Sequence, residues 1–201
     1  NITDYAMTLE IDGGSFTNRD VVSVAHSKAT GNLNITTNGG SIVADRINVG
    51  YDASYRSTGT VNIAGGSLTA NQLFVGNASP GVVNVTGGQL ILPDSGSIRI
   101  GYRRNAVTAG QHGAGGVGTV DFNGSGLIDI SGGTLNATAS NTFVNVGMDD
   151  LLSGGTNEVE YIYGGSSKTA ELRNGEGGTA NISAGNELSI GRDAEGLLTS
   201  A

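Results

Sequence analysis

Apolar and polar residues alternate over short stretches along most of the chain, and glycine interrupts the alternation at regular intervals. Val61-Asn-Ile63 reads apolar, polar, apolar, and the pair Gly65-Gly66 follows after one residue. Leu68 and then Leu73-Phe-Val-Gly76 continue the apolar positions up to the next glycine. Alternation with a period of two places every second side chain on the same face of a β-strand. Each unit therefore predicts three short strands joined by tight glycine turns.

The unit repeats along the chain at a spacing of about 25 residues. An apolar residue followed by glycine or alanine ends each unit, and the second member of these pairs falls at Ala25, Gly50, Gly76, Gly101, Gly147 and Gly191. Successive positions differ by 25, 26, 25, 46 and 44 residues, so each of the last two intervals has room for two units. A fixed repeat length is typical of solenoids, in which each unit stacks on the one before it.

We predict an all-β fold, a right-handed parallel β-helix (β-solenoid) of about eight coils near 25 residues each, in a single domain over residues 1–201. Strands of successive coils would lie about 4.8 Å apart. A meander of β-hairpins is the alternative, but it requires no fixed repeat. The pattern is interrupted near residues 102–117 and 148–178. Both segments follow the apolar–glycine end of a unit, so we expect loop insertions on one side of the solenoid.

Equivalent polar positions lie between inward-facing residues on the first strand of each unit. They hold Asn34, Asn62, Asn84 and Asp121, with Asn181 later in the chain. The flanking inward columns are expected to contain Leu33, Val61, Val83 and Val120, beside Ile35, Ile63, Val85 and Phe122. Stacked asparagine side chains can hydrogen-bond to one another along the axis as a ladder. We therefore assign these outward-facing residues a structural role rather than a binding role.

Composition excludes several classes of protein. The chain has 35 glycines but only 2 prolines, which favours many tight turns over a collagen-like helix. It has no cysteine, so neither a disulfide framework nor a thiolate metal site is expected. A formal net charge of −8 argues against a nucleic-acid partner, which would need a basic face. No apolar run approaches the length that spans a bilayer, so we expect no membrane insertion, and we expect no cofactor.

The order of the motifs is also informative. Ile47-Asn-Val-Gly50, Gly59-Thr-Val-Asn-Ile63 and Gly65-Gly-Ser-Leu68 follow one another around a variable loop, and the same order recurs one unit later. This order resembles the β-strand repeats of bacterial autotransporter passenger domains and of large surface proteins of Planctomycetes and Verrucomicrobia. The resemblance covers most of the chain and is weakest from Met148 to Gly178. It implies a secreted, extracellular or cell-surface location in a bacterium, but no particular activity, because such repeats serve as rods, adhesins and enzyme scaffolds.

Candidate catalytic and metal-binding residues are few. A carbohydrate-active β-helix enzyme would need two carboxylates facing each other across a cleft. Asp149 and Asp150 are the best local candidates, with Glu158 and Glu160 nearby. Adjacent residues on a strand face opposite ways, however, and a solvated loop explains these acids equally well. Asp149 and Asp150 are also weak candidates for calcium binding. We expect a protein that is not an enzyme.

Aromatic and basic residues gather in the segments that follow the apolar–glycine turns. They are Tyr51, Tyr55, Arg56, Tyr102, Arg103 and Arg104. Tyrosine and arginine side chains on loops that leave one side of a rigid scaffold could form a strip for a surface glycan. A glycan-binding adhesin is therefore the alternative function.

The regular coils favour a non-enzymatic structural module of an extracellular or cell-surface fibre. The N-terminal residues begin as an alternating strand, and Glu195–Ser200 resembles the start of another coil. Neither end offers a capping helix. We therefore expect end-to-end association with other copies or neighbouring repeats, which extends into a filament when it does not close on itself. The glycan-binding adhesin and, less favoured, a carbohydrate-active enzyme remain the alternatives.

Overall fold

A computed structural model describes residues 5–26, 29–51, 57–77, 79–101, 103–104, 126–150, 170–182, 187–192 and 196–200. Within these ranges the chain forms seventeen β-strands and no helix. The described residues accordingly contain no helix that is long and apolar enough to cross a membrane. The predicted all-β class is confirmed.

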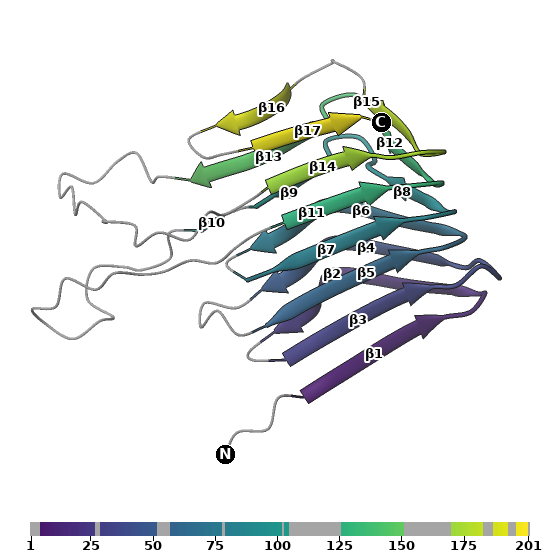
Figure 1. Ribbon diagram of the computed structural model, residues 1–201. Coiled ribbons are helices and arrows are strands. Elements are labelled where there is room, and N and C mark those ends of the chain that lie inside the picture. Colours follow the sequence, from purple (N-terminus) through teal and green to yellow (C-terminus); the bar gives the residue numbers. More distant parts are fainter. Residues whose placement is uncertain are drawn as a thin grey trace, which may run out of the picture.

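The first sheet takes one strand from each coil, stacked in order from the N-terminal to the C-terminal end (Figure 1). Its seven strands are β1 (Tyr5–Ile11), β3 (Ala29–Ile35), β5 (Thr58–Ile63), β7 (Gly81–Val85), β11 (Gly126–Ile130), β14 (Ala170–Asn174) and β17 (Gly196–Ser200). All neighbouring strands in this sheet are parallel. One continuous sheet thus runs the length of the described chain, with seven rungs where the repeat length predicts about eight coils.

The remaining strands form two further sides of each coil. In the first three coils one long strand bends around both sides: β2 (Ser15–His26), β4 (Ser41–Tyr51) and β6 (Ser67–Asn77). In later coils the same path is divided between β8 (Gln89–Ile91), β12 (Thr134–Ala137) and β15 (Thr179–Ile182) on one side and β9 (Ser97–Ile100), β13 (Phe143–Asp150) and β16 (Glu187–Arg192) on the other. The two-residue strand β10 (Arg103–Arg104) pairs with β13.

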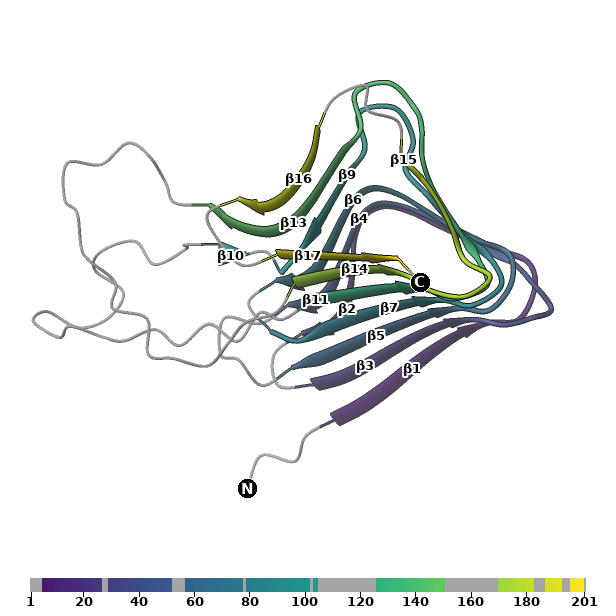
Figure 2. The same ribbon diagram turned by 45° about the horizontal axis from the view of Figure 1, so that its top comes forward.

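The three sides enclose a triangular cross-section (Figure 2). We call the outward side of the first sheet the first face. The second face carries β8, β12, β15 and the first halves of β2, β4 and β6, and the third face carries β9, β13, β16 and the second halves. Seen with the C-terminal end toward the viewer, the chain runs counter-clockwise as it rises (Figure 2). The β-solenoid is therefore right-handed, as predicted.

Apolar side chains fill the interior as columns with one residue from each coil. Strands β7 and β11 alternate strictly between buried and half-buried positions, as a period of two requires. One fully buried column on the first sheet consists of Leu33, Val61, Val83, Ile128 and Leu172. On the third face a second column consists of Ile47, Leu73, Ile98 and Val144. Full burial of each such side chain contributes roughly 1.5–3 kcal/mol.

The first-sheet columns continue through residues other than the predicted Val120 and Phe122, which lie outside the described residues. In the register of the sheet Val83 pairs with Ile128, and Val85 pairs with Ile130. Both segments match the strand pattern, but Ile130 is followed after one residue by a double glycine, as in the earlier coils, whereas Phe122 is not. The glycine pair therefore marks residues 126–130 as the strand that pairs with β7.

Double glycines form the first corner, between the first and second faces. The backbone N–H of Ser67 donates to the Gly40 carbonyl (2.9 Å), and the N–H of Gln89 donates to the Gly66 carbonyl (3.0 Å), so consecutive corners are bonded to each other. Gly66 has φ of +61°, and a Cβ atom there would lie 2.0 Å from the Gly40 carbonyl oxygen. Only glycine meets both requirements, the left-handed backbone and the close approach of the coils.

The second corner, between the second and third faces, widens from the fourth coil onward (Figure 2). Thr69 and Gln72 of the third coil pair with Ile91 and Ser97 of the fourth, so five residues (92–96) replace two (70–71) at this corner. Leu92 is buried within the widened corner and extends the core. The widening explains why β6 is continuous whereas β8 and β9 are separate strands.

Candidate functional site

The predicted insertions fall in the sequence at the third corner, between the third face and the next strand of the first sheet. Residues 105–125 and 151–169, which connect Arg104 to Gly126 and Asp150 to Ala170, lie outside the described residues, so the insertions stay a prediction. Within the predicted limits of 102–117 and 148–178, residues 103–104, 148–150 and 170–178 belong to the regular coils. Ala25, Gly50, Gly76 and Gly101, with φ between +65° and +76°, turn the chain at this corner.

The tyrosine candidates are only partly visible. Tyr51 ends β4 at the third corner, where its ring lies 5.5 Å from the ring of His26 in the coil below, centroid to centroid. Tyr55, Arg56 and Tyr102 lie outside the described residues. A glycan-binding role for this group stays a prediction.

Two basic and two acidic candidates lie side by side in the sheet. Arg103 pairs in register with Asp149, and Arg104 pairs with Asp150. Glycan binding by these arginines and calcium binding by these aspartates stay predictions. In the part of the chain that the structure describes, no group of three or more histidine, aspartate or glutamate side chains could hold a metal ion.

The predicted asparagine ladder is present on the first face for three of its members. Asn62 Nδ2 donates to Asn34 Oδ1 (2.8 Å), and Asn84 Nδ2 donates to Asn62 Oδ1 (2.8 Å). These side chains are half-buried, and the central one, Asn62, bonds to the coil before it and to the coil after it. Three successive coils are thereby joined by side chains as well as by the backbone.

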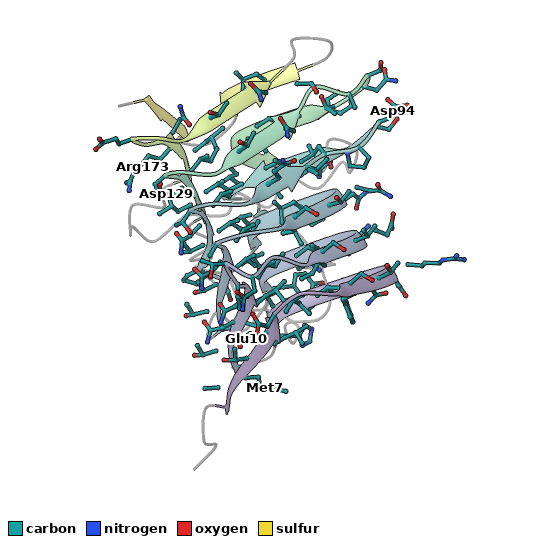
Figure 3. The ribbon with its side chains drawn as sticks, turned by 90° about the vertical axis from the view of Figure 1, so that its right-hand side faces the viewer. Met7, Glu10, Asp94, Asp129 and Arg173 are labelled. Atoms are coloured by element: carbon teal, nitrogen blue, oxygen red, sulfur yellow. The ribbon has the colours of Figure 1, made fainter. Side chains whose placement is uncertain are left out.

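Beyond Asn84 the ladder continues with charged residues that differ from those predicted. Asp129 occupies the next rung and Arg173 the one after it, and Arg173 Nη1 lies 3.2 Å from Asp129 Oδ2 (Figure 3). Asp121, which was predicted at this position, lies outside the described residues. At the other end Glu10 pairs with Asn34 in register.

The prediction that Asn181 belongs to the same ladder is wrong. Asn181 lies on β15 of the second face, where its Nδ2 donates to Asn136 Oδ1 (2.9 Å). Its sequence context, Thr-Ala-Asn-Ile, imitates the first-sheet strand, but it follows the double glycine Gly177-Gly178 instead of preceding one. The position of the glycine pair was the signal that separates the two faces.

Replacing Asn62 by alanine should lower the free energy of unfolding by about 1–2 kcal/mol. The change removes the central amide and both of its hydrogen bonds, and it leaves a half-buried acceptor on Asn34 and a donor on Asn84 without their partners. Urea unfolding followed by circular dichroism measures the loss. Asn181→Ala is the matched control, because it removes one bond between exposed side chains and should cost less than about 0.5 kcal/mol. Equal losses in the two variants would contradict a ladder that stabilises the fold.

A small polar cluster covers the first corner at the N-terminal end. Thr36 Oγ1 and Asn38 Nδ2 of the second coil both donate to Asp12 Oδ1 of the first, the latter at 2.8 Å. The hydrogen bond from Thr36, and then that from Asn38, lowers the pKa of Asp12 below its ordinary value of 3.8. The carboxylate thus accepts bonds from the next coil, in the same manner as the ladder amides.

This cluster makes a pH-dependent contribution to stability. Because folding lowers the pKa of Asp12, the contribution is present above pH 3.8 and is lost as the pH falls through the lower pKa of the folded state. Thr36→Val removes the stronger donor and should move the carboxyl titration of Asp12, followed by NMR, back toward 3.8. Asn38→Ala should produce the smaller movement, and an unchanged midpoint in Thr36→Val would show that the hydrogen bond is not the cause.

The third face holds a cluster that the sequence analysis missed. The guanidinium groups of Arg46 and Arg99 lie over the ring of Phe74, with Cζ-to-centroid distances of 5.6 Å and 5.4 Å. Phe74 and Arg99 occupy the variable position of the apolar-x-apolar-Gly motif, which Asn48 fills one coil earlier. Alignment of these motifs coil by coil would have revealed the side chains that share this face.

Most of the polar contacts described above therefore run along the axis, from one coil to the next. Asn71 Nδ2 donates to Asp45 Oδ1 (2.7 Å) and Arg46 Nε donates to Gln72 Oε1 (2.7 Å) in the same way. This arrangement holds coils together and does not by itself identify a reaction or a ligand. Comparisons of the chain with protein-family models, with curated proteins and with solved structures found no match.

Proposed function

We propose that the chain is a non-enzymatic structural module of an extracellular or cell-surface fibre in a bacterium. The observation that carries the proposal is the direction of the side-chain bonding. Outward-facing amides on two faces bond to the equivalent amides of the next coil, through Asn34, Asn62 and Asn84 on one and Asn136 and Asn181 on the other. Hydrogen bonds between these outward-facing side chains stabilise the contact between successive coils, which a rod requires.

Backbone pairing and the apolar core also connect the coils along the axis. Parallel strands join every coil to its neighbours, and apolar columns run through the interior. Each coil of a solenoid contacts only the adjacent coils, so the length of the rod is set by the number of repeats. These properties fit a spacer whose function is to extend from a surface.

End-to-end association belongs to the same proposal. Met7 is 70% exposed and Leu9 is 42% exposed in β1, the first rung, and both lie at the N-terminal end of the stack (Figures 1 and 3). Leu9 pairs with the fully buried Leu33, so it continues an inward column. A further coil, from a neighbouring repeat or from another copy of the chain, would cover these side chains and bond to the strand edge.

The extracellular location is supported by the motif order shared with autotransporter passenger repeats. That support is an analogy of architecture, because the same fold carries rods, adhesins and enzymes. The charge of −8 is consistent with a soluble surface that does not bind nucleic acid.

Immunogold electron microscopy tests the proposal directly. Antibodies raised against the chain should label fibres or the outer surface of the cells that produce it. Seven rungs span only about 30 Å, so end-to-end association should show as elongated assemblies of the purified chain in negative stain. Pre-immune serum provides the control. Gold confined to the cell interior would contradict the fibre role. Release of reducing ends from any member of a polysaccharide panel by the purified chain would contradict the non-enzymatic assignment.

A further inference from the structure

An arginine–phenylalanine cluster lies on the outward side of the third face. Arg46 of β4, Phe74 of β6 and Arg99 of β9 come from three successive coils. In the register of the sheet Phe74 pairs with Arg99, and Arg46 pairs with Gln72, the residue two positions before Phe74. The two guanidinium groups therefore approach one ring from the coil before it and the coil after it, at 5.6 Å and 5.4 Å.

These contacts hold the two arginines in place before any ligand arrives. A guanidinium group that stacks on a ring uses the face of its plane, so the stacking itself occupies none of its N–H groups. Arg46 is fixed further, because its Nε donates to Gln72 Oε1 (2.7 Å). The planar fork of arginine matches the geometry of a carboxylate or a sulfate, and prior ordering reduces the entropy lost on binding.

The charge around the cluster favours an anionic ligand. The described outward side chains around the cluster are Ser23, Arg46, Asn48, Gln72, Phe74, Ser97 and Arg99, which include two cations and no carboxylate. The nearest acid in the register of this face is Glu187, which pairs with Phe143 two coils beyond Arg99. Asp45 is adjacent to Arg46 in the sequence but lies at the second corner, where it accepts a bond from Asn71. A local positive site on a chain of net charge −8 recognises an anion through short-range contacts rather than long-range attraction.

An exposed aromatic ring lies next to this cluster. Phe143 of β13 pairs in register with Ser97, two residues before Arg99, and it is 38% exposed. Its position one coil beyond Arg99 places an apolar surface beside a cation. That combination suits a sugar ring that bears an acidic group, because the ring covers the phenyl group while the acid reaches the guanidinium.

We propose that the third face binds a linear acidic polysaccharide through Arg46 and Arg99, with Phe143 covered by a sugar ring and Phe74 as the positioning residue. Arg46 and Arg99 are two coils apart, about 10 Å along the axis, so they are spaced to engage acidic groups that recur along an extended polymer. The proposal does not depend on the fibre role, since a rod, an adhesin or a monomer could each carry this face.

Two other polyanions fit the face less well. A nucleic acid gains most of its affinity from many cations along the phosphate chain, whereas the described side chains here supply two cations on an acidic protein. An acidic peptide that adds to a sheet needs an open strand edge. On this face β4, β6 and β9 are each paired on both sides.

Isothermal titration calorimetry on the full chain tests the proposal with three oligosaccharides of similar length: an oligogalacturonate, a heparin oligosaccharide and a neutral cello-oligosaccharide. At least one acidic oligosaccharide should bind, with an affinity that falls as sodium chloride is added, and the neutral one should not. Binding of only one acidic ligand would identify the acid as carboxylate or sulfate. Failure of both to bind, equal binding of the neutral one, or tighter binding of a single-stranded oligonucleotide would overturn the proposal.

Substitutions separate this site from general electrostatics. Arg99→Gln should weaken binding about tenfold, as loss of a charge-assisted pair predicts, and so should Arg46→Gln. Arg173→Gln is the matched control, because it removes one positive charge from the first face and should leave the dissociation constant unchanged. The double variant with both arginines changed to lysine keeps the charge and the fold but loses the planar forks, and it should bind about tenfold more weakly than the wild-type chain. A loss in Arg173→Gln equal to that in Arg99→Gln, or wild-type affinity in the lysine variant, would overturn the assignment.

Phe74→Leu tests the positioning role. Leucine keeps an apolar side chain but removes the ring over which both guanidinium groups lie. We expect affinity for the acidic oligosaccharide to fall about threefold to tenfold while the melting temperature and the circular dichroism spectrum stay close to those of the wild-type chain. Unchanged affinity would show that Phe74 does not order the arginines.

Discussion

Gly66→Ala is expected to lower the free energy of unfolding by about 2–5 kcal/mol. The left-handed backbone at φ of +61° costs an alanine about 1–2 kcal/mol, and overpacking adds about 1–3 kcal/mol. The new methyl group would lie 2.0 Å from the Gly40 carbonyl oxygen and 2.7 Å from the Gly40 nitrogen. Both atoms belong to the backbone, so no side-chain rotation relieves the overlap. Urea unfolding of both proteins, followed by circular dichroism, measures the difference.

Gly13→Ala provides the control at the same corner of the first coil. Gly13 also has a positive φ, +88°, but a Cβ atom there would meet no atom within 4 Å. Only the backbone cost of about 1–2 kcal/mol should remain. If the two variants lost the same stability, close approach between stacked corners would not be what requires glycine at Gly66.

Leu73→Ala should cost about 2–5 kcal/mol. Leu73 is 0% exposed in the third-face column, and its truncation leaves a cavity that the neighbouring coils can close only in part. Leu188 continues the same column at the C-terminal end and is 43% exposed. Leu188→Ala should therefore cost less than about 1 kcal/mol in the same urea experiment. A large loss in Leu188→Ala would mean that burial within the column does not set the cost.

The sequence predicted the parts of the fold that follow local rules. The alternation of Val61-Asn-Ile63 and the glycine pair after it recur in each early coil, so the strands, the first corner and the Asn34–Asn62–Asn84 ladder could all be predicted. The repeat length also predicted stacking in register, because each coil offers the next one an equivalent strand.

The errors came from segments whose sequences share the local pattern of a first-sheet strand. Residues 120–122 match this pattern as well as 128–130 do, and only the glycine pair at 132–133 marks 128–130 as the strand that pairs with β7. Asn181 was misplaced for the same reason. The hydrogen-bond register between coils depends on residues that are far apart in the sequence. Within regular coils the constant repeat length indicates this register, but across a long interruption of the repeat the length no longer does so.

The candidate site was harder to predict than the fold. The predicted glycan site uses tyrosine and arginine residues that follow the apolar–glycine turns, whereas the described arginine–phenylalanine cluster lies on the regular strands. Its members are separated by 28 residues from Arg46 to Phe74 and by 25 from Phe74 to Arg99. They become neighbours only when strands of different coils are paired, so a search for motifs within a short window does not detect them.

The widened second corner bears on how the coils find their order during folding. Nearly identical coils can stack out of sequence, because any one offers the same strand edge to several others. The extra residues of the fourth and fifth coils bond to each other, from Leu92 N to Asn136 O (2.8 Å), from Ser95 N to Ser140 O (3.0 Å) and from Phe143 N to Gly96 O (2.9 Å). If a narrow coil took the place of either the fourth or the fifth coil in this pair, these backbone groups would be left unpaired. The widened corner thus makes stacking in the wrong order less favourable than stacking in the native order.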